Sequence, residues 1–472
     1  MAKRLLLDLV PLRQSRDFRL LFAGQIVSIA GSQLTGVAIP FQVYAETRSS
    51  LQVGAVSLAQ LGPLVLGALA GGALAGAFDR RRLLVACCSL LALTSLGLSL
   101  NAWLVPGPHG SRGSLLAVYL VSACAAALGG IVSSASGGIV PTLVESGQLT
   151  AAYATMQVVD QVGMVSGPAI AGVLIGTAGL GVAYGLDAFT FAAWAVVSSQ
   201  LSPMPPTPGS PRPGLAAIGQ GLGYVRRRQL LLGAFLVDLD ATIFGAPRAL
   251  FPALTRTVFH GGARTLGCLY AAPAAGALVA AVTTGWLATI RRRALTVVAA
   301  VCAWGACIVA FGLARRLWLA LVLLGLAGAA DVVSAVLRDT ILQTSVGNAL
   351  RAQIASLQMA VVEGGPRLGD LEAGAVASVV STQFSILSGG VACIAGAIAL
   401  ALFLPGFRGD RGAGADPADG DRPEPTAAGE AAPLDGRRPE QPIEAGEAEA
   451  GVGRRAEQPI AAAGEAEAIR SW

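Results

Sequence analysis

The chain has 472 residues, of which 54% are apolar, 13% are charged and 60 are glycines. Soluble domains average about 25% charged residues and about 7% glycine, so this composition excludes a soluble globular enzyme. The formal net charge of +5 combines a basic body with an acidic C-terminal segment, because residues 407–472 hold 8 arginines against 14 acidic residues.

The scarcity of certain side chains excludes further kinds of chemistry. Lys3 is the only lysine, and His109 and His260 are the only histidines. The chain therefore lacks a Walker A lysine, a Schiff-base lysine and the histidines of a metal cluster or catalytic triad. We predict no cofactor and no metal. Basic residues cluster only in loops, so we expect no nucleic-acid partner.

Twelve apolar stretches are long enough to cross a lipid bilayer. Each needs about 20 mainly apolar residues, and lipid offers no partners for backbone groups, so each must be helical. The sequence therefore predicts an all-α polytopic membrane protein. The predicted spans are residues 19–43, 52–77, 83–104, 114–138, 154–177, 180–200, 231–254, 266–290, 295–313, 318–342, 355–380 and 384–405.

The arginines predict how these spans are oriented. If the N-terminus is inside, the inside segments hold 18 basic residues and the outside loops hold 6. Cytoplasmic loops carry such an excess of arginine and lysine. We therefore expect a multi-pass protein of the cell membrane with both termini in the cytoplasm, and with His109 and His260 on the outer side.

Polar residues form a stripe on the first span, within an arc of about 80° at about 100° per residue. Such residues line a water-filled cavity or form hydrogen bonds between helices, and their spacing does not separate the two roles. The substrate-cavity candidates are Gln25, Ser28, Ser32 and Thr35, together with Asn101 and Gln157.

Arginine clusters follow the second and eighth spans. The segment from Gly72 to residues 80–82 resembles the segment from Gly285 to residues 291–293. This faint repeat indicates two six-helix halves, a plan that secondary transporters use. The clusters are typical of orientation anchors, and gating is the alternative. The gating candidates are Asp79, Arg80, Arg81, Arg291 and Arg351.

The fifth span contains a carboxylate followed by a run of small residues. Asp160 precedes Gly163, Gly167, Pro168 and Gly172. Small residues allow helices to approach closely, so we expect this run to pack helices and Asp160 to carry a proton.

The halves are separated by a linker and followed by a tail. Six prolines within residues 203–213 predict an extended cytoplasmic linker at that point. The tail is too poor in apolar residues to bury a core, so we expect it to be disordered. The predicted domains are 1–200, 201–229, 230–406 and 407–472.

Spans seven and ten carry ionisable side chains, each of which costs about 2.5–3.5 kcal/mol in a bilayer. Asp238 and Asp240 lie about 200° apart around the helix, so at most one faces a cavity centrally. Asp331 and Arg338 share a face but are separated by about 10.5 Å of helical rise. We expect each to pair with a charge on span seven, such as Asp331 with Arg248, for proton coupling or as a structural ion-pair network.

Span eleven contains a proline beside two glycines. The segment from Glu363 through Pro366 to Arg367 predicts a broken helix, because proline removes a backbone donor and clashes with the preceding turn. Glu363 is therefore a candidate for gating or proton coupling. The alternative is a kink whose charges pair locally.

A series of short motifs extends over about residues 5–407. The motifs are Asp17-Phe-Arg-Leu-Leu21, Gln52-Val-Gly54, Leu100-Asn-Ala-Trp103, Gly163–Gly172, Ala330-Asp331, Arg338–Gln343, Arg351 and Leu368–Gly374. Their order resembles the enterobactin-exporter and macrolide-efflux-like branch of the major facilitator superfamily, and the glycine run of span five is similar to its antiporter motif.

The resemblance implies a monomeric secondary transporter built from two pseudo-symmetric six-helix bundles around a central cavity. It implies export of small amphipathic molecules, siderophore-like or drug-like, by proton antiport through alternating access. This chain departs from the loop motif of that family, since it has Gly76 and Ala77 where the motif has Asp and Arg, and Asp79 is our candidate substitute for the missing Asp. Because the spans lack histidine, carboxylates must carry any protons.

Other functions remain open. The altered loop at Gly76 and Ala77 is compatible with a transporter or channel without coupling, or with a sensor that has lost transport. A polytopic membrane enzyme is a further alternative, against which the histidine and lysine counts argue. We predict a transporter rather than an enzyme, with a small molecule and protons as its partners.

Overall fold

The computed structural model describes residues 10–104, 112–137, 139–145, 148–205, 215–283, 287, 290–346 and 350–408. The chain divides into two compact units, Met1–Asp416 and Pro417–Trp472, and every described residue belongs to the first. His109, most prolines of the predicted linker and nearly all of the predicted tail lie outside the described residues.

The first set of helices covers the N-terminal half of this unit. Its long helices correspond to the first six predicted spans. The elements are α1 (Val10–Gln14), α2 (Arg16–Thr47), α3 (Ser50–Ala77), α4 (Arg80–Leu104), α5 (Arg112–Gly137), α6 (Val140–Leu143), α7 (Leu149–Ala178) and α8 (Leu180–Ser199).

The second set follows an additional helix, α9 (Leu215–Arg227), in the linker region. Predicted span seven is divided among three elements, α10 (Gln229–Phe244), the 3-10 helix η3 (Arg248–Leu250) and α11 (Phe251–Thr257). The others are α12 (Ala263–Thr283), α13 (Arg293–Leu313), α14 (Leu317–Ser345), α15 (Arg351–Val379), α16 (Thr382–Phe403) and α17 (Pro405–Arg408).

Eleven segments of the described chain are long and apolar enough to cross a membrane. The remaining long helix, α15, has 29 residues and is more polar than these segments. Every predicted span coincides with helix over most of its length. The predicted all-α polytopic fold class is confirmed.

Serine side chains fix the starts of several spanning helices. The Oγ atoms of Ser15, Ser49 and Ser381 accept hydrogen bonds from the backbone N–H groups three residues later, at 3.1, 3.4 and 3.1 Å. Each bond satisfies one of the donors that the first turn of a helix leaves free. These caps set the beginnings of α2, α3 and α16.

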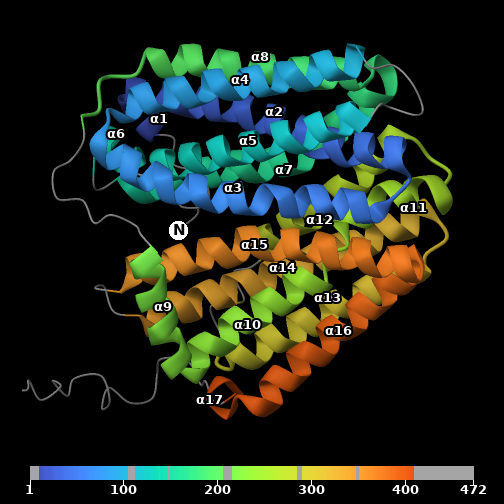
Figure 1. The fold of residues 1–472 in the computed structure, drawn as a ribbon. Coiled ribbons are helices and arrows are strands. Elements are labelled where there is room, and N and C mark those ends of the chain that lie inside the picture. The colour runs from blue at the N-terminus through green and yellow to red at the C-terminus, as the bar shows by residue number, and fades with distance from the viewer. Residues whose placement is uncertain are drawn as a thin grey trace, which may run out of the picture. The chain divides into compact units, whose positions relative to one another are not determined.

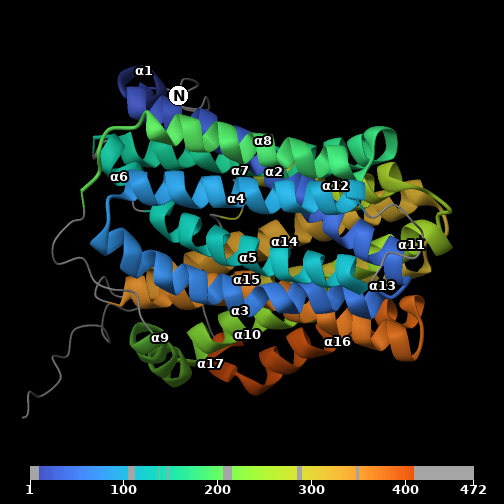
Figure 2. The ribbon, with the colours of Figure 1, turned by 45° about the horizontal axis from the view of Figure 1, so that its top comes forward.

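The long helices form two sets that meet along one boundary (Figures 1 and 2). α3 and α15 run side by side along it in Figure 1, and α7 packs against α12. The second helix of each set therefore meets the fifth helix of the other. We name the end that carries the starts of α2 and α4 the N-terminal end, and the end with the α2–α3 turn the far end.

Two short helices attach to the second set at the N-terminal end (Figure 1). On α9, Val225 is buried, and a Cβ on Gly221 would lie 3.0 Å from the carbonyl oxygen of Gln353 in α15. On α17, Phe407 is fully buried against Gly233 of α10. The linker helix and the end of the described chain therefore both pack on the second set.

Candidate functional site

The boundary between the two sets is closed near the far end by glycines. A Cβ on Gly374 of α15 would lie 2.5 Å from the carbonyl oxygen of Ser50 in α3, and one on Gly54 would collide with the backbone of Asp370. Only glycine permits backbones to come this close. Further along α3, a Cβ on Gly67 or Gly71 would collide with the backbone of α5, whereas one on Gly62 or Gly76 meets nothing within 4 Å.

The glycine run of α7 closes the other side of the boundary at the same end. A Cβ on Gly172 would lie 2.6 Å from the carbonyl oxygen of Ala263 in α12, and one on Gly267 of α12 would lie 2.5 Å from that of Pro168. Gly163 and Gly167 instead face Ile29 and Gln33 of α2. The four residues of the predicted helix-packing motif therefore all lie on faces of α7 that contact neighbouring helices.

Span seven is broken between Phe244 and Arg248, at a Gly-Ala-Pro sequence. In a continuous helix, the N–H of Ala249 would donate to the carbonyl oxygen of Gly245. Here that oxygen accepts a hydrogen bond from Trp304 Nε1 of α13 at 3.0 Å. The Ala249 N–H donates to Asp370 Oδ1 of α15 at 3.0 Å. Side chains of two other helices thus satisfy the groups that the break releases.

Span eleven is not broken, contrary to our expectation. α15 is continuous from Arg351 to Val379, with Pro366 inside it. Its Gly365 and Gly369 lie against Thr242 and Ile243, so these glycines allow α15 to approach α10 closely. Close packing explains the glycines without an interruption, and neighbouring helices commonly stabilise proline in spanning helices.

The charges beside this proline pair locally on α15. Arg367 Nη1 lies 3.0 Å from Glu363 Oε2 and also donates to the backbone carbonyl of Glu363. The Glu363 side chain is 43% exposed and its partner 22%, which places the pair partly in contact with solvent or lipid. This local pairing is the alternative that the sequence left open for span eleven.

A buried ion pair joins spans seven and ten. Arg338 Nη2 of α14 lies 2.8 Å from Asp238 Oδ1 of α10, and the two side chains are 9% and 8% exposed. Arg338 Nη1 also donates to Ser334 Oγ at 3.1 Å. Asp331 lies at the midpoint of α14, and the expected Asp331–Arg248 ion pair is not formed in the described residues.

Asp240 faces a different helix from Asp238, as their angular separation predicts. Its carboxylate lies against Gly396 of α16, where a Cβ would collide with it. Its Oδ2 is buried and has no hydrogen-bond partner among the described residues. Asp240 is thus turned toward α16, whereas Asp238 is turned toward α14.

The polar stripe of α2 divides between two neighbouring helices. Gln25 Nε2 donates to Asp160 Oδ1 of α7 at 3.5 Å, whereas Thr35 Oγ1 donates to Asp187 Oδ2 of α8 at 2.6 Å. Ser32 Oγ is bonded within α2, to the carbonyl oxygen of Ser28 at 2.9 Å, and the Ser32 side chain is exposed. Of the other cavity candidates, Gln157 is exposed on α7 and Asn101 lies near the end of α4.

Asp187 is a buried carboxylate that the sequence analysis missed. It is 1% exposed, and its Oδ2 accepts hydrogen bonds from Thr35 of α2 and Ser95 of α4, the latter at 2.7 Å. Its Oδ1 has no partner in the described chain and lies beside Gly31. The rule that an acid inside a spanning segment is a functional candidate would have identified it.

The gating candidates lie at the N-terminal end. Asp79 Oδ1 accepts from the N–H of Arg81 at 2.9 Å, and its Oδ2 accepts from the N–H of Met204 at 3.1 Å. The backbone N–H of Arg80 donates to the Met204 carbonyl oxygen at 3.2 Å. Asp79 therefore begins α4 and holds the segment after α8. Arg291 is exposed, and the side chain of Arg351 lies outside the described residues.

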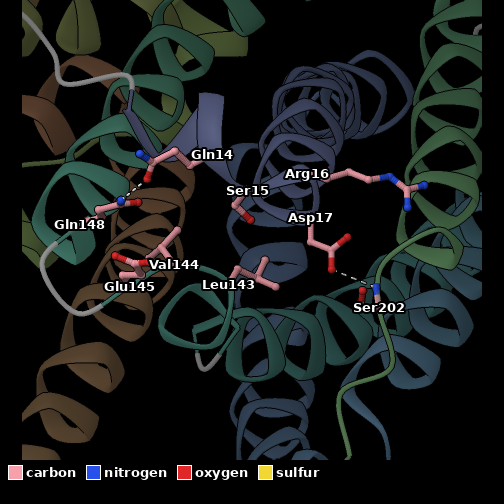
Figure 3. A pocket seen from close by; sticks show the side chains of 9 residues that line it. All are labelled: Gln14, Ser15, Arg16, Asp17, Leu143, Val144, Glu145, Gln148 and Ser202. Carbon is pink, nitrogen blue, oxygen red and sulfur yellow. Dashed lines mark hydrogen bonds between the residues drawn. The ribbon is translucent and has the colours of Figure 1, made fainter. Parts of the chain in front are cut away.

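A polar pocket of about 420 Å³ opens at the same end (Figure 3). Gln148 Nε2 donates to Gln14 Oε1 across one side, and the Ser202 N–H donates to Asp17 Oδ2 at 3.2 Å across the other. Asp17, like Asp79, thus holds the segment that leaves α8. The remaining lining residues are Ser15, Arg16, Leu143, Val144 and Glu145.

The described residues contain no group of three or more His, Cys, Asp or Glu side chains that is arranged to hold a metal ion. Their functional chemistry consists instead of carboxylates and arginines inside spanning segments, together with a boundary closed at one end. This arrangement suits a protein that moves a solute between its two sets of helices.

Comparisons with known proteins agree with this geometry. A family model described as transmembrane secretion effector matches residues 7–416. The enterobactin exporter EntS of Escherichia coli O139:H28 (strain E24377A / ETEC) is 30% identical over 403 residues, which cover 85% of this chain and 95% of the relative. The same-named protein of Shigella boydii serotype 18 (strain CDC 3083-94 / BS512) gives the same values.

Solved structures of transporters share the fold. A POT family transporter in complex with 5-aminolevulinic acid is 10% identical with a TM-score of 0.65, covering 83% of this chain and 97% of that one. The nucleoside transporter NupG is 13% identical with a TM-score of 0.59, covering 82% and 98% of the two chains.

Proposed function

The chain belongs to the transmembrane secretion effector family of major facilitator transporters, and from this premise we propose that it exports small amphipathic molecules by proton antiport through alternating access. The observation that carries the proposal is the boundary between the two sets of helices. Glycine contacts close it at the far end, while carboxylates lie in the spanning segments beside it.

The orientation proposed for this boundary follows from the arginines. With both termini in the cytoplasm of a cell-membrane protein, the closed far end faces outward and the N-terminal end faces the cytoplasm. A solute would then approach from the cytoplasm and leave after the glycine contacts have separated. Single cysteines at Ser210 and Ser111, in a background without the native cysteines, should label from opposite sides of the membrane. Labelling from the same side would contradict this orientation.

Two carboxylates are the strongest candidates for carrying the proton. Asp160 is partly exposed on α7 and has a single long hydrogen bond to Gln25, while Asp331 lies midway along α14 without an ion pair among the described residues. Protonating Asp238 would instead leave Arg338 without its buried partner, which is costly. Asp240 and Glu363 remain candidates because each lies in a spanning segment.

The test uses purified protein in liposomes with an imposed pH difference and an amphipathic dye. We expect Asp160→Asn or Asp331→Asn to abolish gradient-driven transport while preserving exchange of dye between the two sides, because neutral asparagine cannot take up and release a proton. Glu145→Gln, in the pocket at the N-terminal end, is the control and should retain coupling. If every single variant at residues 160, 238, 240, 331 and 363 still transports uphill on a pH gradient, proton coupling through these groups is wrong.

A further inference from the structure

Three arginines lie well inside the described spanning segments, and one of them differs from the others. Arg338 is paired with Asp238, and Arg367 is paired with Glu363. Arg248 has an exposed side chain and no acidic oxygen within 4.0 Å among the described residues. An unpaired charge in a membrane is tolerated where it faces a water-filled cavity. Because a charge that faced lipid would be costly, we expect the exposed Arg248 to face such a cavity, where it is available to a ligand.

The backbone of Arg248 is held firmly at the boundary between the two sets. Its carbonyl oxygen accepts a hydrogen bond from the Tyr270 hydroxyl of α12 at 3.1 Å. The next residue, Ala249, donates its N–H to Asp370, whose other oxygen accepts from Ser57 Oγ of α3 at 2.7 Å. The backbone of η3 is thus held by α12 and α15 and is linked through Asp370 to α3 of the first set, which fixes the point from which the side chain extends.

The backbone of Arg248 lies beside the closed contacts, because the next residue, Ala249, donates to Asp370, whose backbone lies against Gly54 of α3. The guanidinium lies within electrostatic range of Asp370 and of Asp331, which is at the midpoint of α14. Both oxygens of Asp370 already accept hydrogen bonds, and Asp331 is beyond ion-pair distance. An anion that binds Arg248 therefore breaks no ion pair. The partly exposed ring of Tyr270 lies nearby and offers apolar surface.

Building on the proposed export function, we propose that Arg248 binds the anionic group of the transported molecule and that the substrates are amphipathic organic anions. The planar guanidinium presents a fork of donors that matches a carboxylate, sulfonate or phosphate in two parallel hydrogen bonds. The break in span seven places this fork on the solute's path, and the paired Arg338 and Arg367 are not available for that role.

The test compares two xanthene dyes of similar size, anionic fluorescein and cationic rhodamine 123, with the full chain in lipid nanodiscs. Fluorescence anisotropy should show that Arg248→Gln weakens fluorescein binding by about tenfold or more, the loss expected for a charge-assisted bidentate contact. Rhodamine 123 binding should remain nearly unchanged. Arg248→Lys should lose less, because it retains the charge without the fork. Arg315→Gln, at an exposed arginine in the α13–α14 turn, is the matched control.

The outcomes separate this inference from the proposed function. If Arg248→Gln weakens both dyes equally, or if the wild type binds rhodamine 123 and not fluorescein, anion recognition by Arg248 is overturned. Transport of rhodamine 123 on a pH gradient would then still support export. If the wild type transports neither dye on a gradient, the proposed export itself is contradicted, and the assignment of Arg248 falls with it.

Discussion

Replacing Asp238 with asparagine should destabilise the protein more than any other single carboxylate substitution in spans seven and ten. The change keeps the size of the side chain and removes its charge, which leaves Arg338 buried without its partner at 2.8 Å. Removing one member of a buried pair costs about 3–5 kcal/mol. We expect about 3 kcal/mol, the low end of this range, because Ser334 Oγ still accepts a hydrogen bond from Arg338.

Two further variants show whether the stranded charge is the cause. Asp238→Asn combined with Arg338→Met removes both charges and should recover most of the lost stability, since apolar replacements of buried pairs are often neutral. Asp240→Asn should change stability by less than about 1 kcal/mol, because Asp240 has no ion-pair partner among the described residues.

The measurement is unfolding in mixed micelles by titration with sodium dodecyl sulfate, followed by tryptophan fluorescence. An Asp238→Asn variant as stable as the wild type would refute the reasoning. So would a double variant that is less stable than Asp238→Asn alone, because the damage would then come from lost packing rather than from an unpaired arginine. A larger loss with Asp331→Asn would show that Arg338 depends on Asp331 instead.

Two other predictions concern the end of the helical unit and the closed boundary. A chain that ends at Arg411 should insert and transport normally. By contrast, Phe407→Ala should lower the free energy of unfolding by about 3 kcal/mol, because it empties a fully buried site on α10. Fluorescence-detected size exclusion after heating should therefore show a lower melting temperature. Equal behaviour of Phe407→Ala and the wild type would contradict the docking of α17. Gly172→Val should fold but lose transport in the liposome flux assay, because its Cβ would lie 2.6 Å from the Ala263 carbonyl oxygen and so keep α7 and α12 from closing the far end. Gly62→Val should transport normally in the same assay, because a Cβ there meets nothing within 4 Å.

The fold was largely predictable from the sequence because the features that set it are local. Twenty apolar residues in succession specify a spanning helix whatever its neighbours are. The starts of α2, α3 and α16 were likewise within reach of sequence reasoning, since each begins with a serine that caps its own first turn.

Our sequence analysis predicted the break in span eleven, but it lies in span seven. The free-energy cost of interrupting a helix depends on whether other helices satisfy the backbone groups that the break releases. Pro366 and its glycines satisfied the local rule for an interruption, yet α15 remains continuous and packs closely on α10. Proline in the Gly245–Pro247 segment does interrupt span seven, where Trp304 and Asp370 replace the lost backbone hydrogen bond. Neither partner is adjacent in sequence, so periodicity and composition do not reveal them.

The sequence also could not show which charged side chains form ion pairs with one another. The spacing of Asp331 and Arg338 correctly excluded a direct contact, but it did not determine which acid of α10 would meet Arg338. The partner of Arg338 depends on the axial position of α14 relative to α10, which the sequence does not show. Asp187 was missed although the rule for an acid inside a spanning segment applies to it. What the sequence does not show is its hydroxyl donors from two other helices, Thr35 and Ser95.

The central claim, that this protein couples solute export to an inward proton gradient, is tested most directly by flux in liposomes whose protein exposes its N-terminal end outward. Acidifying the lumen should drive accumulation of an amphipathic dye above its level in protein-free liposomes, and a proton ionophore should abolish that accumulation. The amount of dye in the liposomes is measured by fluorescence after filtration and lysis at a fixed pH. Accumulation that is unchanged by the gradient and the ionophore, at verified insertion of the protein, would contradict the account.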